Sequence, residues 1–210
     1  MPLKVLPAGK ADMYRAAVIE RHAYAPLKTN DILFPGPLLA DSLKYRAGDL
    51  EKEVEEPNVF WFKVVDTDIE GDESEQTISV AKWTVYDQNH PVKPKSPRSL
   101  PPGSNAEACE LLFGTIDKLQ PKHIGGRPHI FFGILATEAK HQGRGAASLL
   151  LKKCIEEAEA KRLPIYLDSS EMGHPVYLKH GFRDLEEVAT DFSKWGLEKP
   201  HLLWAMIKEQ

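Results

Sequence analysis

Apolar positions recur along this chain with two periods, which predict a mixed α/β domain. Helical spacing of apolar residues marks segments 10–24, 38–55, 106–119 and 146–162, with a shorter helix at 175–180. Runs rich in β-branched and aromatic residues predict strands at 3–6, 58–65, 77–86, 129–137, 165–168, 182–188 and 201–207. We therefore expect a central, mostly antiparallel sheet flanked by helices.

The strand at 129–137 is apolar on both faces, which predicts a central position in the sheet. The long helix that follows it leads into the strand at 165–168. A helical crossover of this kind joins parallel neighbours, so we expect these two strands to be parallel and splayed.

Composition indicates one globular domain that spans residues 1–210. The chain is 42% hydrophobic and 28% charged, and its net charge of −4 offers no general attraction for nucleic acid or an anionic membrane. We expect a cytoplasmic protein, because no apolar run reaches the roughly 18 residues of a membrane helix and the N-terminus lacks a signal peptide. Cys109 and Cys154 form no C-x-x-C pair, so we expect no metal. The proline-rich segment 89–103 is interpreted as a mobile loop.

A glycine-rich turn between the central strand and the long helix is the main candidate site. The turn and first helical residues are Gln142, Gly143, Arg144, Gly145, Ala146, Ala147 and Ser148. A helix N-terminus offers unpaired N–H groups, and glycine lets them approach an anion closely. Neither the P-loop nor the G-x-G-x-x-G dinucleotide pattern fits this spacing. A pyrophosphate cradle is favoured over a helix start without a ligand.

Residues 142–147 match Q/R-x-x-G-x-G/A, and the segment therefore resembles the acetyl-CoA motif of the GCN5-related N-acetyltransferase (GNAT) family. The resemblance covers most of the chain and is strongest over 129–182; the segments 167–173 and 191–206 also look like fungal-type members. It implies an acetyl-CoA cleft between the splayed strands. It also implies that the strand end Leu135, Ala136 and Thr137 contacts the pantetheine arm.

A second match, Y-x-x-x-G-F, begins at Tyr177. In many members of the family this tyrosine protonates the leaving thiolate, which makes Tyr177 the candidate general acid. The alternative is an aromatic anchor that packs the short helix on the core.

The general base is where the sequence departs from the family. Several relatives carry glutamate or histidine at the positions held here by Phe131 and Gly133, neither of which takes a proton. His129 shares a strand face with Phe131 and is our candidate base, against the alternative of a strand-end histidine in solvent. Further candidates are Asp168, Glu20 and His174.

The acceptor pocket is expected beside segments 24–34 and 190–195, with Tyr24, Phe34 and Asp168 as candidate contacts and Phe192 and Trp195 as further aromatics. The leading hypothesis is transfer of an acetyl group from acetyl-CoA to a small-molecule amine, by direct attack in a ternary complex. A protein amine as acceptor, a non-catalytic acyl-CoA-binding module and a domain without cofactor remain alternatives. The chain is expected to be a monomer or homodimer.

Overall fold

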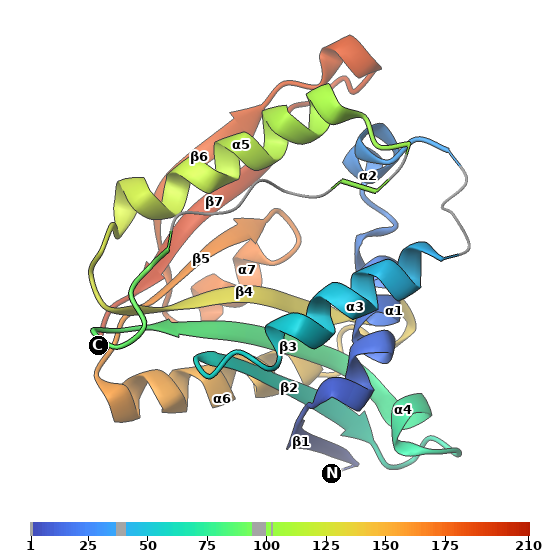
Figure 1. Ribbon diagram of the computed structural model, residues 1–210, viewed down its shortest axis with the longest axis vertical. Helices are drawn as coiled ribbons and strands as arrows, with labels where there is room; N and C mark the ends of the chain where they lie inside the picture. The colour runs from blue at the N-terminus through green and yellow to red at the C-terminus, as the bar shows by residue number, and fades with distance from the viewer. Residues whose placement is uncertain (1, 37–40, 94–99, 102) are drawn as a thin grey trace.

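The computed structural model describes residues 2–36, 41–93, 100–101 and 103–210, and it shows one seven-stranded sheet with helices on both faces (Figure 1). The strand order is β1-β2-β3-β4-β5-β7-β6. The strands are β1 (Leu3–Pro7), β2 (Val59–Asp66), β3 (Thr77–Tyr86), β4 (His129–Thr137), β5 (Ile165–Ser170), β6 (Arg183–Thr190) and β7 (His201–Lys208). All neighbours are antiparallel except β4 and β5, so the predicted fold class is confirmed.

Helices cover the two faces of the sheet unequally. The longer helices are α1 (Met13–Tyr24), α3 (Ser42–Glu53), α5 (Ala106–His123) and α6 (Ala146–Lys161). Two neighbouring residues of β5 point to opposite faces of the sheet. Leu167 packs in the α6 core, whereas Tyr166 packs beside Leu119 of α5. The α6 helix therefore covers one face, while α1 and α3 lie over one half of the other face and α5 over its second half (Figure 1).

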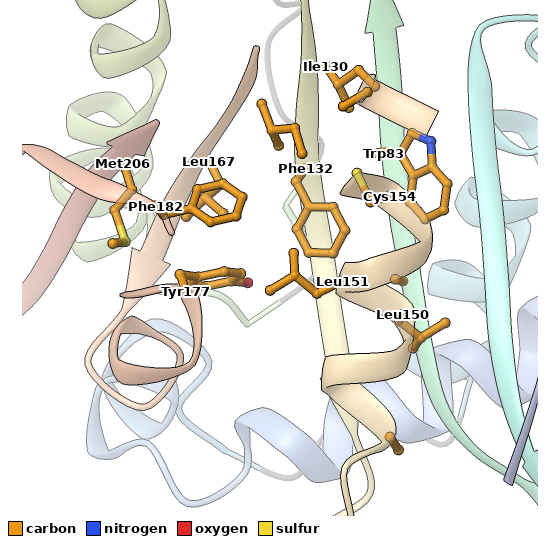
Figure 2. Packing of buried hydrophobic residues seen from close by; sticks show 14 of the residues in the cluster. Trp83, Ile130, Phe132, Leu150, Leu151, Cys154, Leu167, Tyr177, Phe182 and Met206 are labelled. Carbon is orange, nitrogen blue, oxygen red and sulfur yellow. The ribbon is translucent and has the colours of Figure 1, made fainter. Parts of the chain in front are cut away.

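The apolar side of α6 forms the main core. Leu150, Leu151 and Cys154 point from the helix toward the sheet and are fully buried (Figure 2). They meet buried residues from five strands and from α7 (His174–Lys179) in one cluster, which includes Trp83, Ile130, Phe132, Leu167, Tyr177, Phe182 and Met206. This core holds β4 and β5 under one helix even where the two strands are not hydrogen-bonded to each other.

The two parallel strands part soon after they begin. Their pairing consists of Ile130 with Ile165 and Phe131 with Tyr166. On the other edge of β4 the register to β3 shifts, because Trp83 faces Phe132 while the preceding Lys82 faces Ile134. Gly133 is thus an extra residue that bends β4. The predicted splayed pair is confirmed.

Sequence reasoning placed β3 and β4 at their observed bounds but missed several short elements. These are the helices α2 (Lys28–Leu33) and α4 (Glu73–Gln76) and the 3-10 turns η2 (Ala139–His141) and η3 (Ser193–Trp195). The predicted helix 10–24 begins with a 3-10 turn, η1 (Lys10–Asp12), which leads into α1. Helix α5 also runs past Pro121 to His123, whereas we predicted its end at residue 119. Parts of the predicted helix 38–55 and loop 89–103 lie outside the described residues. In the part of the chain that the structure describes, no helix is long and apolar enough to cross a bilayer.

Candidate functional site

The glycine turn presents backbone donors to open space. Gly143 and Gly145 have φ of 74° and 88°, a conformation that favours glycine, and Gly145 is the N-cap of α6. The first bond of the helix runs from the N–H of Leu149 to the carbonyl of Gly145, so the N–H groups of residues 146–148 have no intrahelical acceptor. A Cβ added at either glycine would meet no atom within 4 Å. An anion can therefore reach these donors.

Side chains of the turn are engaged with the protein itself. Arg144 Nη2 lies 2.6 Å from Asp66 Oδ2 at the end of β2, and Arg144 Nη1 lies 3.1 Å from His141 Nδ1. Gln142 donates through Nε2 to the carbonyl of Thr137 at 3.2 Å. Burial opposes ionisation of Asp66, but hydrogen bonds from Arg144 and from the Asp68 backbone hold the pKa of Asp66 below its usual value. These contacts fix the shape of the turn, and its backbone donors remain for a ligand.

A buried carboxylate ties α1 to the same turn. Glu138 follows β4 and accepts from Arg15 Nη2 at 2.6 Å, and its second oxygen lies 3.2 Å from His22 Nδ1. Arg15 also donates to the carbonyl of Thr77. Burial would raise the pKa of Glu138, but Arg15 and then His22 bring it below its usual value. The helix α1 thereby holds the strand end that leads into the glycine turn.

The edge of β4 that faces β5 is open beside the glycine turn. The carbonyl of Ala136 accepts from Ser79 Oγ, and the N–H of Glu138 donates to Ile78, so both residues direct these groups toward β3. Because alternate strand residues point to opposite edges, Leu135 and Thr137 direct their backbone groups toward β5. Pairing with β5 ends at Phe131, so a hydrogen-bonded strand does not fill this edge.

Tyr177 lies on α7 beside the point where the strands part (Figure 2). Only 7% of the residue is exposed, and its ring makes edge contacts with Phe132 and Phe182 at centroid distances of 6.2 and 5.6 Å. Burial, followed by the nearby Tyr24 hydroxyl, raises the pKa of Tyr177 well above its ordinary value. The phenol therefore carries its proton at neutral pH, as a proton donor must.

The structure places His129 away from this region, at the opposite end of β4 from the glycine turn. It is fully buried, with Nδ1 2.7 Å from the carbonyl of Arg127 and Nε2 2.9 Å from Gln120 Nε2. The carbonyl requires the proton on Nδ1, so Nε2 accepts from Gln120. Burial lowers the pKa of His129. Since both ring nitrogens are occupied, this geometry contradicts our hypothesis of a base and indicates a structural role.

The other candidate bases have partners of their own. Glu20 accepts two hydrogen bonds from Arg46, at 2.8 and 2.9 Å. His174 Nε2 lies 2.8 Å from Asp184, and its ring stacks on Trp204 at 4.4 Å. Both Glu20 and His174 are therefore engaged by other residues, and neither stands out as a general base.

The predicted acceptor residues divide into two groups. Tyr24 is half-buried at the end of α1, and burial and then Glu20 raise its pKa to about 12. Its electrostatic effect contributes to the raised pKa of Tyr177. Asp168 is half-buried on β5 and accepts a hydrogen bond from Tyr166. Phe34, by contrast, packs against a core cluster below α5 that includes the fully buried Phe192. The structure thus places Tyr24 within electrostatic range of Tyr177 and assigns Phe34 and Phe192 to packing.

Sequence reasoning missed three residues of this region, which are Asp66, Glu138 and Tyr166. Each is a single polar residue at or near a strand end, a pattern that is equally typical of a turn or a solvated face. Asp66 pairs with Arg144 and Glu138 pairs with Arg15, far away in the sequence, so only the fold reveals these two residues. Tyr166 donates to Asp168 two positions away, but the sequence does not show that Tyr166 is fully buried. Among the described residues, no cluster of three or more His, Cys, Asp or Glu side chains is arranged to hold a metal.

A family model described as an acetyltransferase (GNAT) domain matches residues 120–193, which include β4, the glycine turn, α6 and Tyr177. No curated protein sequence shows a significant match.

Solved structures share the fold over the full chain. A protein from Corynebacterium glutamicum described as histone acetyltransferase HPA2 and related acetyltransferase is 22% identical, with a TM-score of 0.63 and coverage of 100% of this chain and 97% of that one. The C-terminal condensation domain of Ebony, in complex with β-alanyl-dopamine, has 12% identity, a TM-score of 0.72 and 99% coverage of both chains. Arabidopsis thaliana NAA60, in complex with acetyl-CoA, has 11% identity, a TM-score of 0.55 and 99% coverage of both.

The family match covers the segment that carries the glycine turn and Tyr177, and the structural matches extend the same fold to the ends of the chain. Residues 120–193 therefore match the acetyltransferase (GNAT) domain, and the whole chain shares the fold of these solved structures.

Proposed function

We propose that this protein transfers an acetyl group from acetyl-CoA to the primary amine of a small molecule, by direct attack in a ternary complex. One observation carries the proposal: the donor-rich start of α6 lies directly beyond the open edge of β4. A ligand with a pyrophosphate and an extended amide-containing arm matches both features at once. The solved relative that holds acetyl-CoA supports this choice of ligand.

The residues present fit acetyl-CoA, which supplies the acetyl group as a reactive thioester. The N–H groups of residues 143–148 bind the pyrophosphate, and the partial positive charge of the α6 N-terminus adds to the attraction. The backbone of Leu135 and Thr137 pairs with the pantetheine amides as an added strand does, with Ala136 between them. Gln142 and Arg144 hold the turn in shape through Thr137 and Asp66.

Tyr177 is the proposed general acid. The amine nitrogen bonds to the acetyl carbon, the carbon–sulfur bond breaks, and the Tyr177 hydroxyl gives its proton to the sulfur. Its raised pKa keeps the phenol protonated before this step. The amine attacks in its neutral form and afterwards loses its extra proton to water, and solvent restores the proton of Tyr177. No side chain is assigned as the base.

A small acceptor is supported by the relative with the highest TM-score among the three described above, whose bound ligand is β-alanyl-dopamine. A protein amine is the alternative, because the 22% identical relative is described as a histone acetyltransferase. The face between α1 and α5 is where either acceptor would approach the parting strands.

The test is release of free thiol from acetyl-CoA in the presence of a panel of small amines and of lysine-containing or free N-terminal peptides. Turnover with at least one small amine, and slower turnover with peptides, is the expected result. Faster turnover with peptides than with small amines would indicate that the acceptor is a protein. Binding of coenzyme A without turnover of any acceptor would indicate a non-catalytic acyl-CoA-binding protein.

A further inference from the structure

The turn between β5 and α7 holds the backbone of the proposed general acid. Gly173 is the N-cap residue of α7. Its carbonyl accepts hydrogen bonds from the N–H groups of Val176 and Tyr177, at 2.9 and 3.2 Å. Tyr177 thus lies one helical turn beyond Gly173, on the same side of α7.

The space beside the Tyr177 ring exists because residue 173 has no side chain. A Cβ added to Gly173 would lie 3.0 Å from Tyr177 Cε2. Carbon atoms that are not bonded to each other are attracted best at about 3.5–4.0 Å, so a methyl group here would push the ring by about 0.5 Å. Gly173 has φ of −80° and ψ of −30°, which any residue adopts, so the ring and not the backbone restricts this position.

The ring is enclosed on its other sides. Phe132 and Phe182 meet it edge-on at 6.2 and 5.6 Å between centroids, and Tyr177 is 7% exposed. All three residues belong to the α6 core, and the Tyr177 ring extends from α7 toward β4 (Figure 2). Because a close-packed interior has little free space, the ring cannot move away from a new methyl group without displacing these neighbours.

The turn is also held against the end of β5. The N–H of Gly173 donates to the carbonyl of Ser170 at 3.1 Å and lies 3.3 Å from Ser170 Oγ. Ser169 is 1% exposed, and its hydroxyl donates to the same carbonyl at 2.9 Å. These hydrogen bonds oppose a shift of Gly173 away from the ring. A methyl group at residue 173 would therefore displace the tyrosine, and Cε2 is bonded to the carbon that carries the hydroxyl.

We propose that Gly173 is a positioning residue, whose missing side chain lets the Tyr177 hydroxyl reach the sulfur of acetyl-CoA. This inference rests on the proposed function, in which Tyr177 gives its proton to that sulfur. Proton transfer requires the two heavy atoms to lie within about 2.6–3.2 Å of each other. A misplacement of about 1 Å can lower a rate roughly 10²-fold, so about 0.5 Å should cost roughly tenfold. The effect belongs to the transition state and leaves the binding of acetyl-CoA unchanged.

The test is a cycle of Gly173→Ala, Tyr177→Phe and the double variant. Thiol release is followed with acetyl-CoA and phenylethylamine, or with the fastest amine of the panel if phenylethylamine is not acetylated. Gly173→Ala should lower kcat roughly tenfold at an unchanged KM for acetyl-CoA. In the Tyr177→Phe background it should not change kcat, because no hydroxyl remains to be displaced. Phenylalanine keeps Cε2, so the change in melting temperature caused by Gly173→Ala should be the same in both backgrounds.

Gly126→Ala is the matched control, because a Cβ at Gly126 would meet no atom within 4 Å. Its kcat should equal that of the wild type. All values of kcat are expressed per coenzyme A site counted by calorimetry, so that unfolded protein does not contribute. An unchanged kcat in folded Gly173→Ala, or an equal loss of kcat in both backgrounds, would overturn the inference.

If Gly173→Ala does not fold, Ser170→Ala decides the matter. It removes the hydroxyl beside the Gly173 N–H and adds no clash, so kcat should fall about threefold in the presence of Tyr177 and not in the Tyr177→Phe background. An unchanged kcat would then overturn the inference. If the wild type acetylates no amine, or if Tyr177→Phe retains kcat, the proposed role of Tyr177 fails and the inference fails with it. A loss of kcat in Tyr177→Phe without one in the folded Gly173 variant would overturn the inference alone.

Discussion

Arg144 of the glycine turn forms an ion pair with Asp66 at the end of β2, with 2.6 Å between Nη2 and Oδ2. Only 2% of the Asp66 side chain is exposed, so the pair is well shielded from water on the carboxylate side. From the sequence alone, Arg144 is a candidate contact of the pyrophosphate. The structure instead uses this arginine to anchor the turn to the β2–β3 hairpin, and the turn offers its ligand backbone N–H groups.

Arg144→Ala should therefore cost stability as well as affinity. It leaves Asp66 buried without its ion-pair partner, which typically costs about 3 kcal/mol of unfolding free energy. Affinity for coenzyme A should fall because the turn loses its anchor. Urea unfolding and calorimetry measure the two effects. Arg127→Ala is the control, because the Arg127–Glu209 pair is exposed and should contribute less than about 1 kcal/mol. Equal stability losses in the two variants would contradict the anchoring role.

The Glu138 cluster predicts a loss of stability in acid. Its pKa is lowered in the fold, so the unfolded chain binds the proton more readily as the pH falls. The stabilisation is present above the ordinary pKa of 4.5 and is lost as the pH falls through the lower value of the folded protein. Glu138→Gln should be less stable at pH 7 and should show a shallower decline as the pH falls below 4.5. Urea midpoints over this range give the comparison, and parallel declines would contradict the prediction.

Replacement of His129 should affect folding rather than chemistry. His129→Leu leaves Gln120 and the Arg127 carbonyl without their partner, which should cost roughly 2–3 kcal/mol of stability. The pH dependence of kcat in the folded fraction should match that of the wild type. A stable variant with a large loss of kcat would restore His129 as the base.

Tyr177→Phe keeps the ring contacts with Phe132 and Phe182 and removes the proton donor. The expected result is a fall in kcat of roughly 10²-fold with little change in the KM for acetyl-CoA. A thermal melting curve shows whether the variant keeps the stability of the wild type, as it should if the ring packing is unchanged. If kcat is retained in a well-folded variant, Tyr177 is an aromatic anchor and water protonates the thiolate.

The elements with strong periodicity were predictable, and those defined by distant partners were not. The pattern of β4 and α6 predicted the splayed strands, because a helical crossover leaves few alternatives. Helices α2 and α4 are too short to show a period. The role of His129 could not be read from strand alternation, since Gln120 and Arg127 reach it only through the folding of α5 against the sheet. In the same way, the ion pair of Arg144 with Asp66 could not be predicted, because the two residues are far apart in the sequence.

Calorimetric titration of coenzyme A into the wild type and two Gly145 variants tests the central claim most directly. Gly145 has φ of 88°, so Gly145→Ala and Gly145→Asp share a backbone strain of about 1 kcal/mol, but only the aspartate adds negative charge beside the open donors. The account predicts binding by the wild type, and an affinity of Gly145→Asp at least ~2 kcal/mol weaker than that of Gly145→Ala. Equal affinity in the two folded variants, or no binding by the wild type, would contradict it.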